Sequence, residues 1–381
     1  MNQSRQKRAF FVINSLEGGG AERVFTTLIE RLSDRLSADI ELVLLDRLPE
    51  IYKIPVEIRR HQLDCRQGYL ASVTQLVALV RRERPDLLFS FLTRSNCAAV
   101  VAGSLTGAPV TLSERVHTSS HLGQGAAINK LIVRLLYPLA KHIVATSHGV
   151  AQDLRENYGV SATRISVMYN PVQRDYIMTR ALEPAPIALP PTTWLAIGRL
   201  TANKNFAMLI DAFAQADVPG DLVILGEGPE RQALLRLAAV RGIGDRVHLP
   251  GFVDNPYACL RRAYAYLSAS NAEGFPNSLV EALVVGVPVA VTDCDSGPSE
   301  VLGGALASKV KRATEAEHGI LVPMRDSAAM AEAMRKLAAS APRAHYAERA
   351  LRRSEDFDFA RTLDEYATLL NAVISGETSR R

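Results

Sequence analysis

Two stretches in the second half of the sequence carry side chains suited to gripping an anionic, activated substrate. In the first, Arg199 and Lys204 lie five positions apart, just after an apolar run that ends at Gly198. A guanidinium group offers a planar fork for phosphate oxygens, and an ammonium group adds a compact positive charge. The pair therefore suits a diphosphate leaving group, whose negative charge grows as its bond breaks. The alternative is that each cation is a solvated surface charge.

The second stretch, residues 267–300, places two acids eight positions apart, Glu273 and Glu281. Glu273 lies in a loop shaped by glycine and proline, and a helical run from Ser278 follows. A helix start presents backbone N–H groups and the positive end of the helix dipole, which favours a phosphate or sugar hydroxyls. For Glu281 the alternative is a capping box with Ser278, and for Glu273 it is a solvated loop acid.

Two features of the first half of the sequence are further candidates. Gly18, Gly19 and Gly20 follow a predicted strand and precede helical spacing, so a phosphate or sugar could approach their backbone. No Walker or GxGxxG motif is present there, and a plain tight turn is the alternative. His117 follows another predicted strand, where it could donate to a phosphate or accept from a hydroxyl. A satisfied or surface histidine is its alternative.

Short apolar runs alternate with helical spacing along most of the chain. This alternation predicts an α/β fold with doubly wound parallel sheets, whose strand carboxyl ends form the ligand-binding edge. The predicted strands of the first half are residues 9–13, 40–45, 87–92, 109–112, 142–146 and 165–168. Those of the second half include 194–198, 221–225, 247–251 and 289–292, and helices are predicted at 329–338 and 359–374. The partial GxGxxG at 226–231 has arginine in place of the third glycine, so we interpret it as a turn with structural glycines.

The length predicts more than one domain. A chain of 381 residues exceeds the roughly 250–300 residues that one core usually serves. Residues 181–192 are rich in proline and lack periodicity, as is typical of a connector. We therefore expect domains at 1–180 and 193–355, joined by this linker and followed by a helical segment at 356–381.

Composition excludes several classes of protein. The four cysteines are widely spaced, which argues against a disulfide scaffold or a metal cage and favours the cytoplasm. The net charge is only +4, no apolar run is long enough to span a bilayer, and the apolar part behind the basic start is too short for a signal peptide. Residues Ala126 to His142 form a basic amphipathic stretch, which suits either a membrane interface or a core-facing helix with a solvated basic edge.

The run Glu273-Gly-Phe-Pro-Asn-Ser-Leu-Val-Glu281, with Gly286-Val-Pro288 and Ser296-Gly-Pro-Ser-Glu300 behind it, resembles the signature of glycosyltransferase family 4. The resemblance implies the GT-B fold, in which two Rossmann-like domains face a central cleft. It also implies that the first domain binds the acceptor, that the second binds a nucleotide-sugar, and that the final helix crosses back to the first. The activity it implies is sugar transfer with retention of anomeric configuration.

The resemblance also assigns roles to the candidate residues. Arg199 and Lys204 would hold the diphosphate, Glu281 would bond the ribose hydroxyls, and His117 with the Gly18–Gly20 loop would line the acceptor side. The remaining substrate-binding candidates are Glu273 with Gly274, Phe275 and Pro276 for the donor sugar, Asn277, Ser278 and Leu279 for helix-start amides, and Phe252 and Val253 beside the nucleobase.

Together these observations predict a hexosyltransferase that moves a sugar from a nucleotide-diphospho-sugar, with UDP-sugars favoured, to a hydroxyl of a lipid-linked or envelope-polysaccharide acceptor. The enzyme would work in the cytoplasm, with peripheral contact to the inner membrane through Ala126 to His142. We expect no cofactor, no nucleic acid and no metal, because Asp293 and Asp295 fit a loop terminus better than a DxD metal motif. The alternatives are a sugar-nucleotide epimerase of the same fold and a non-catalytic partner in polysaccharide assembly. Residues 302–318 have no assignment.

Overall fold

The computed structural model describes residues 5–123, 126–303 and 309–377. The chain divides into two compact units, unit 1 (Met1–Pro171 with Ala360–Arg381) and unit 2 (Val172–Phe359). The division falls after Pro171, whereas the sequence placed the end of the first domain at residue 180. The reason is α7 (Arg174–Ala181), which packs in unit 2: the Asn255 side-chain amide donates to the Arg180 carbonyl at 2.8 Å.

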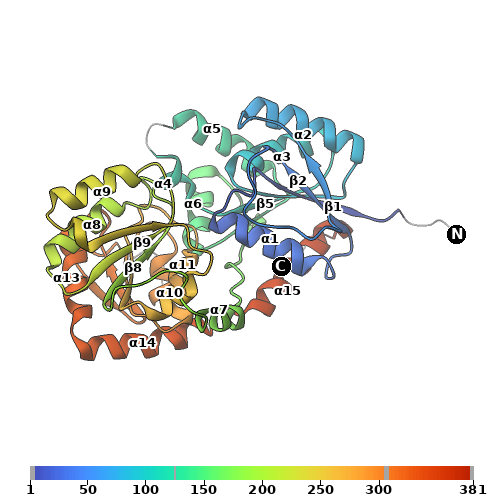
Figure 1. Cartoon of the computed structure of the whole chain (residues 1–381). Coiled ribbons are helices and arrows are strands. Elements are labelled where there is room, and N and C mark those ends of the chain that lie inside the picture. Colours follow the sequence, from blue (N-terminus) through green and yellow to red (C-terminus); the bar gives the residue numbers. More distant parts are fainter. Residues whose placement is uncertain (1–4, 124–125, 304–308, 378–381) are drawn as a thin grey trace. The chain divides into compact units, whose positions relative to one another are not determined.

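Unit 1 is built on a seven-stranded parallel sheet in the order β3-β2-β1-β4-β5-β6-β7 (Figure 1). Its strands are β1 (Arg8–Ile13), β2 (Asp39–Leu44), β3 (Arg59–Gln62), β4 (Leu87–Phe91), β5 (Val110–Glu114), β6 (His142–Ala145) and β7 (Ile165–Val167). Its helices are α1 (Gly20–Leu32), α2 (Tyr69–Glu83), α3 (Thr93–Thr106), α4 (Thr118–Leu122), α5 (Ala127–Leu136), α6 (His148–Tyr158) and α15 (Phe359–Ser375). The strand order reverses between β1 and β4, so the ends of these two strands lie at a topological switch point.

The last helix completes unit 1. On α15, the Tyr366 ring lies 6.2 Å from the ring of Phe89, between centroids, and its hydroxyl accepts from Arg115 at 3.2 Å. Near its end, the Ile374 carbonyl accepts from the Lys7 ammonium at 3.0 Å. Helix α15, which begins 192 residues after the end of β7, thereby packs against aromatic side chains of the sheet in unit 1.

Unit 2 has a second seven-stranded sheet in the order β10-β9-β8-β11-β12-β14-β13. Its strands are β8 (Thr193–Ile197), β9 (Asp221–Leu225), β10 (Val247–Gly251), β11 (Ala265–Ser268), β12 (Val289–Thr292), β13 (Thr314–Ala316) and β14 (Gly319–Val322). Its helices after α7 are α8 (Phe206–Ala216), α9 (Arg231–Val240), α10 (Pro256–Arg262), α11 (Asn277–Val284), α12 (Pro298–Gly303), α13 (Ser327–Ala338) and α14 (Ser340–Ser354). Among the described strands of this sheet, only β13 runs antiparallel to its neighbour.

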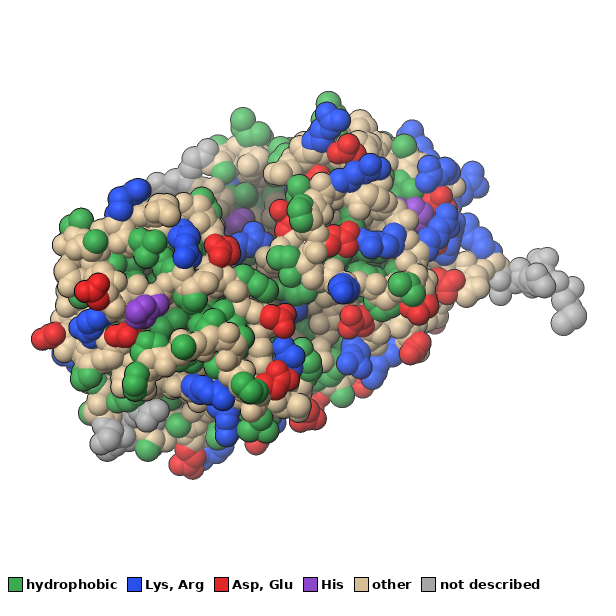
Figure 2. Space-filling model, in the orientation of Figure 1, with side chains coloured by type: hydrophobic (Ala, Val, Ile, Leu, Met, Phe, Trp, Pro, Cys, Tyr) green, Lys and Arg blue, Asp and Glu red, His purple; other side chains and the backbone are tan. Residues whose placement is uncertain are grey.

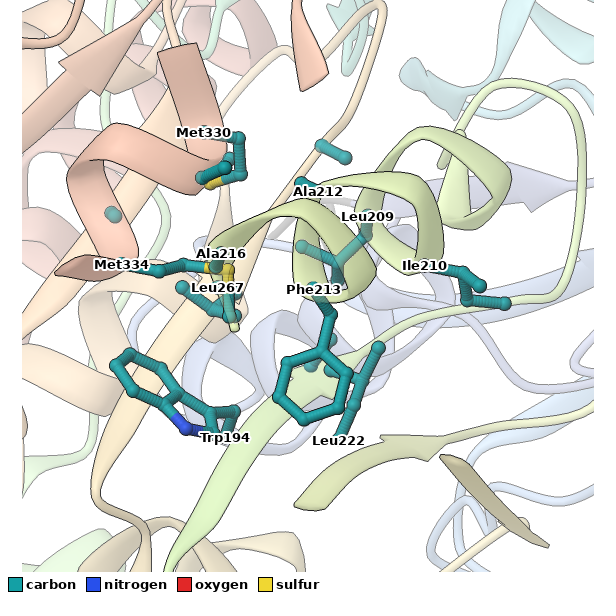
Figure 3. Close-up of a cluster of buried hydrophobic side chains, with 14 of the residues drawn as sticks. Trp194, Leu209, Ile210, Ala212, Phe213, Ala216, Leu222, Leu267, Met330 and Met334 are labelled. Atoms are coloured by element: carbon teal, nitrogen blue, oxygen red, sulfur yellow. The ribbon is translucent and has the colours of Figure 1, made fainter. Parts of the chain in front are cut away.

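The core of unit 2 is formed where α8 and α13 cover one face of the sheet. Figure 3 shows Phe213 of α8 beside Leu222 of β9, with Met330 and Met334 of α13 also facing the cluster. Trp194 at the start of β8 is fully buried, and its indole N–H donates to the Pro219 carbonyl at 3.0 Å, so its one polar atom is satisfied.

The stretch from Ala126 to His142 differs from the single helix expected. Helix α5 ends at Leu136, a 3₁₀ turn at Tyr137–Leu139 contains Pro138, and His142 begins β6. Proline cannot donate the backbone hydrogen bond that would continue the helix. The core-facing alternative holds for part of the stretch, because Val133 is buried and Ile132 and Leu136 pack against the core of unit 1. The other apolar side chains face outward, since Ile128 is 75% exposed and Leu135 is 62% exposed.

No helix over the described ranges is both long and apolar enough to cross a bilayer. Parts of the predicted segments, namely residues 1–4 and 378–381 at the ends of the chain and 304–308 within the unassigned stretch, lie outside the described residues.

Candidate active site

The strongest candidate site lies at the carboxyl ends of β8 and β11 in unit 2. These strands are neighbours, with Ala265 paired to Trp194, and the strand order reverses between them. Loops at such a point diverge onto opposite faces of the sheet and leave room for a ligand. Arg199 and Lys204 follow β8, and Glu273 follows β11.

Amide groups join these two loops. The Asn271 backbone N–H donates to the Asn203 carbonyl at 2.8 Å, and the Asn203 side-chain amide donates to the Ala272 carbonyl at 2.9 Å. The Asn271 side-chain amide donates to the Ala202 carbonyl at 3.1 Å. These bonds fix the loops relative to each other, and no motif that we identified in the sequence indicated them.

The loops bring a predicted cation and a predicted acid into contact. The Lys204 ammonium donates to the Glu273 carboxylate with an N–O distance of 2.5 Å, and these side chains are 25% and 14% exposed. The ammonium has three N–H groups, so one bond to Glu273 leaves donors for another anion. Arg199 extends from the same loop as an exposed side chain.

The start of α11 bears on the alternative that Ser278 and Glu281 form a capping box. The helix begins at Asn277, its N-cap Pro276 provides no side-chain bond, and Ser278 is therefore not an N-cap. The Ser278 hydroxyl instead pairs with the Tyr266 hydroxyl at 2.7 Å. The capping-box interpretation of the buried Glu281 is thus wrong.

Leu279 is less suited to substrate contact than the sequence suggested. Its side chain is fully buried, and its amide donates to the Pro276 carbonyl at 3.0 Å. Phe275 is also buried, and its ring packs edge-on against Phe357 at 5.5 Å between centroids. Both residues hold the loop and the helix in place.

A third loop, after β12, supports Glu273. The Ser296 hydroxyl donates to the Glu273 carbonyl at 2.6 Å. Gly297 has a φ of +96°, and a Cβ there would lie 2.8 Å from Pro276 Cδ, so a larger residue does not fit without movement. Asp293 in the same loop accepts from the Ser299 hydroxyl and from the Val310 amide, which agrees with a loop terminus.

The turns after β9 and β10 complete this edge of the sheet. A Cβ on Gly226 would lie 2.0 Å from the Gly198 carbonyl oxygen, and one on Gly228 would lie 2.4 Å from that of Leu200. The interpretation of these residues as structural glycines is therefore confirmed. Beyond β10, Phe252 is 57% exposed and available for stacking, whereas Val253 is buried.

The remaining predicted residues, Gly18–Gly20 and His117, lie in unit 1. Gly18 has a φ of +109°, and a Cβ there would lie 2.6 Å from Ile51 Cδ1. Gly19 is the N-cap of α1, and its carbonyl accepts from the Arg23 amide at 3.0 Å. The glycines thus shape a close turn at the end of the central strand β1.

His117 is the N-cap of the short helix α4. Its Nδ1 accepts from the Ser120 amide at 3.3 Å and lies 2.8 Å from the Ser120 hydroxyl. A ring nitrogen that accepts from a backbone N–H carries no proton, so in the neutral ring Nε2 holds the proton and is a donor. Asp153, which sequence reasoning missed, accepts from the Ser119 amide at 3.0 Å and lies 3.9 Å from His117 Nδ1. It belongs to α6, so no local pattern links it to His117.

A buried polar network lies beneath this part of unit 1. Burial raises the pKa of the Glu114 carboxyl, at the end of β5, to about 7. The Tyr137 hydroxyl donates to Glu114, and the Arg115 guanidinium, also buried, donates to the Asn170 carbonyl oxygen of the side chain and to the Tyr366 hydroxyl. The network ties the end of β5 to the turn after α5 and to α15.

Each of the two units contains a segment that matches a family model of known proteins. Residues 18–176 match the family model described as "Glycosyltransferase Family 4", and residues 191–340 match "Glycosyl transferases group 1". A relative from Campylobacter jejuni subsp. jejuni serotype O:2, named N-acetylgalactosamine-N,N'-diacetylbacillosaminyl-diphospho-undecaprenol 4-alpha-N-acetylgalactosaminyltransferase, is 34% identical over 78% of this chain and 84% of its own. The lipopolysaccharide 1,6-galactosyltransferase of Escherichia coli is 31% identical over 43% of this chain and 46% of its own.

Solved structures share the fold. HepE from Anabaena in complex with UDP has a TM-score of 0.74 at 19% identity and covers 96% of this chain and 100% of its own. The lipopolysaccharide outer core galactosyltransferase WaaB has a TM-score of 0.68 at 21% identity, covering 97% and 99%. Both are glycosyltransferases of the GT-B fold. With a family signature matched in sequence and a relative aligned over most of its length, the chain belongs to glycosyltransferase family 4 and is a glycosyltransferase.

Proposed function

We propose that this enzyme transfers a sugar from a UDP-sugar to a hydroxyl of a lipid-linked glycan, and that the donor binds to unit 2. The observation that carries the proposal is the contact between Lys204 and Glu273, which joins the loops after β8 and β11 at the switch point of the sheet. The relative from Campylobacter is named for a diphospho-undecaprenol acceptor, and HepE binds UDP. Both names support the donor and acceptor classes proposed here.

In this proposal the two cations neutralise the leaving group. Lys204 keeps its bond to Glu273 or exchanges it for a phosphate oxygen, and the exposed Arg199 closes on the diphosphate from the same loop. Glu281 accepts from the ribose hydroxyls. Glu273 accepts from hydroxyls of the donor sugar, which orients the anomeric carbon.

The proposed reaction retains the anomeric configuration. The bond between the anomeric carbon and the diphosphate oxygen breaks, and its electron pair leaves with the diphosphate. The acceptor oxygen attacks from the same face, and its proton passes to the departing phosphate oxygen. Arg199 and Lys204 favour this step because they stabilise charge that develops on the leaving group.

In unit 1 we assign the acceptor side to His117 and the glycine turn. With Nδ1 accepting from Ser120, His117 presents Nε2–H as a donor toward substrate oxygens. The backbone of Gly19 and Gly20 permits close approach of a sugar, since neither residue carries a side chain, whereas the space beside Gly18 is filled by Ile51.

We further propose that α5 lies on the cytoplasmic face of the inner membrane. Its exposed apolar row consists of Ile128, Leu131 and Leu135, with Lys130 and Arg134 on the same helix, and Leu139 of the following 3₁₀ turn is also exposed. In Figure 2 apolar side chains reach the outer surface where Figure 1 places α5. Leucine side chains buried in the interface, with lysine and arginine near anionic headgroups, give such helices their affinity.

A donor screen tests the proposal. Thermal unfolding of the whole chain is measured with UDP-, GDP-, ADP- and dTDP-sugars, and a UDP-sugar should raise the Tm, since a ligand at about 100 times its Kd adds roughly 2.7 kcal/mol. The donor that binds is then incubated with and without membrane-extracted lipid acceptors. Transfer only with acceptor supports the proposal, whereas a changed monosaccharide without acceptor would identify an epimerase.

The matched variant is Lys204→Ala. It should abolish transfer without lowering the Tm of the free protein, because Lys204 is partly exposed and its loop is held by the asparagine bonds. An unchanged transfer rate would contradict the assignment of the diphosphate to this loop.

A further inference from the structure

Arg325, a cation without a role in the reaction proposed above, lies in the turn between β14 and α13, at the carboxyl edge of the sheet in unit 2. Its Nε donates to the side-chain oxygen of Asn271 at 3.4 Å, which is a long bond. Within the described part of the chain, Arg325 forms no ion pair with an acid. Because the side chain is exposed, its two terminal nitrogens are accessible to a ligand.

The local backbone does not favour an arginine at this position. Arg325 has a φ of +60°, in the left-handed region that residues with a Cβ rarely adopt. It also directly precedes Asp326, the N-cap of α13, where the positive end of the helix dipole disfavours a cation. The carboxylate of Asp326 accepts from the Ala329 amide at 2.9 Å and is occupied as a cap. A residue that carries two such costs is more typical of a binding position than of a plain turn.

The bond to Asn271 places the guanidinium beside the loops of the proposed donor site. The Asn271 side-chain amide donates to the Ala202 carbonyl at 3.1 Å, and its backbone N–H donates to the Asn203 carbonyl at 2.8 Å. Ala202 and Asn203 directly precede Lys204, and Asn271 lies two residues before Glu273. The guanidinium therefore contacts the side chain that joins the loop of a proposed cation to the loop of the proposed sugar-binding acid.

The strand order indicates which end of the donor the guanidinium would meet. The sheet runs in the order β10-β9-β8-β11-β12-β14, so β10 and β14 lie on opposite sides of the switch point between β8 and β11. Phe252, the exposed candidate for stacking on the nucleobase, directly follows β10. A cation after β14 therefore lies toward the other end of the donor, where the β-phosphate carries the sugar.

We propose that Arg325 is a third cation of the donor site and binds the β-phosphate of the nucleoside diphosphate, an inference that rests on the proposed transferase function. A guanidinium held through Nε keeps its terminal N–H groups for phosphate oxygens. The contact between Lys204 and Glu273 offsets one of the charges already assigned to the diphosphate. A third cation restores the positive surplus that favours a diphosphate over a monophosphate.

Calorimetric titration of the whole chain with UDP and with UMP tests the proposal. The variant Arg325→Gln removes the charge and keeps an uncharged donor group. The matched control is Arg84→Gln, because Arg84 is also an exposed arginine with a positive φ, +52°, and it belongs to the end of α2 in unit 1.

Wild type and the control should bind UDP more tightly than UMP. Arg325→Gln should bind UDP about tenfold more weakly and UMP with unchanged affinity, because UMP has no β-phosphate. Unchanged UDP affinity in Arg325→Gln would overturn the proposal. An equal loss for UDP and UMP would also overturn it, since it would indicate displaced loops rather than a lost phosphate contact.

A second variant separates binding from folding. Arg325→Gly removes the cation and relieves the positive φ, because glycine adopts left-handed conformations without a steric cost. Without ligand, its Tm should equal or exceed that of wild type, as should that of Arg84→Gly, and only Arg325→Gly should lose UDP affinity. Wild-type UDP affinity in Arg325→Gly would again overturn the proposal. Absence of UDP binding in wild type would instead contradict the proposed function, so the two failures are distinguishable.

Discussion

At the scale of single residues, the contact between Lys204 and Glu273 allows the roles of the two side chains to be tested separately. In the free protein Glu273 holds one donor of Lys204. Glu273→Gln should therefore leave UDP affinity equal or higher, because the carboxylate no longer competes for the ammonium. Transfer should fall by about 10²–10³, as expected for the loss of one preorganised polar contact.

Kinetics and calorimetry on the same preparation check this prediction. The control is Glu227→Gln, which removes another acid from the same edge of unit 2. A Glu273→Gln variant that transfers at the wild-type rate, or loses UDP binding, would contradict the role given to this carboxylate.

Glu114 gives a pH dependence whose sign follows from burial. Its pKa is raised to about 7 in the folded protein, above the ordinary value of 4.5, so its contribution to stability is fully present below about pH 4.5 and is lost as the pH rises through 7. Gln is neutral throughout and keeps an oxygen for the Tyr137 hydroxyl. The Tm of Glu114→Gln should therefore rise relative to wild type between pH 5 and pH 8.

Thermal unfolding at closely spaced pH values measures the difference in Tm between Glu114→Gln and wild type. The contributions of the other titrating groups are the same in both proteins and cancel in this difference. A constant difference in Tm over that range would show that Glu114 does not titrate as its burial requires.

The sequence indicated which residues could bind a substrate better than it indicated their hydrogen-bond partners. Arg199, Lys204 and Glu273 could be found because motif and strand ends coincide there. Asn203 and Ser296 could not be assigned, since each bonds a backbone group from a loop far away in sequence. Such contacts depend on the strand order, which local patterns do not specify.

At the scale of elements, close glycine contacts should control the donor loop. Gly228 leaves no room for a Cβ against Leu200, which precedes Lys204 in the loop after β8. Gly228→Ala should therefore destabilise unit 2 by about 1–3 kcal/mol, as overpacking does, and should weaken UDP binding by displacing the loop.

Denaturant unfolding and UDP titration measure both effects. Gly244→Ala is the control, because a Cβ there would meet only atoms at ordinary contact distances of 3.5 Å or more. Equal stability and affinity of the two variants would show that the loop adapts without cost.

The exposed row of α5 leads to a prediction about membranes. Leu131→Gln with Leu135→Gln should reduce sedimentation with phosphatidylglycerol vesicles about tenfold, because apolar area is lost from the interface, and should leave the Tm unchanged. Leu182→Gln with Val240→Gln removes equally exposed apolar groups from unit 2 and should change neither. Equal vesicle binding by both pairs would contradict the role of α5.

Elements with strong periodicity were predictable, and those that depend on pairing were not. The long buried strands of both sheets were found within one or two residues. Strands β3, β13 and β14 were missed: β3 is polar, with only His61 buried, and β13 is short and largely exposed. The end of α5 was also missed, although Pro138 was visible, because the leucine pattern continues past it.

At the scale of the whole molecule, the length of the chain and the alternation of apolar runs with helical spacing sufficed to predict two α/β units. The run from Glu273 to Glu281 sufficed to predict the family. The division at Pro171 was harder to place, because α7 packs on α10 through bonds such as that from Asn255, while its sequence offers no sign of which unit it joins. The linker was instead predicted at residues 181–192, after α7, because that segment is rich in proline.

The central claim is that the loops after β8 and β11 of unit 2 grip the diphosphate of an activated sugar. The most direct test is calorimetric titration of UDP into wild type, Lys204→Gln and the control Arg236→Gln. Wild type and control should bind alike, and Lys204→Gln should bind at least about tenfold more weakly with an unchanged Tm, since a charged phosphate donor is lost. Identical dissociation constants for all three proteins would contradict the claim.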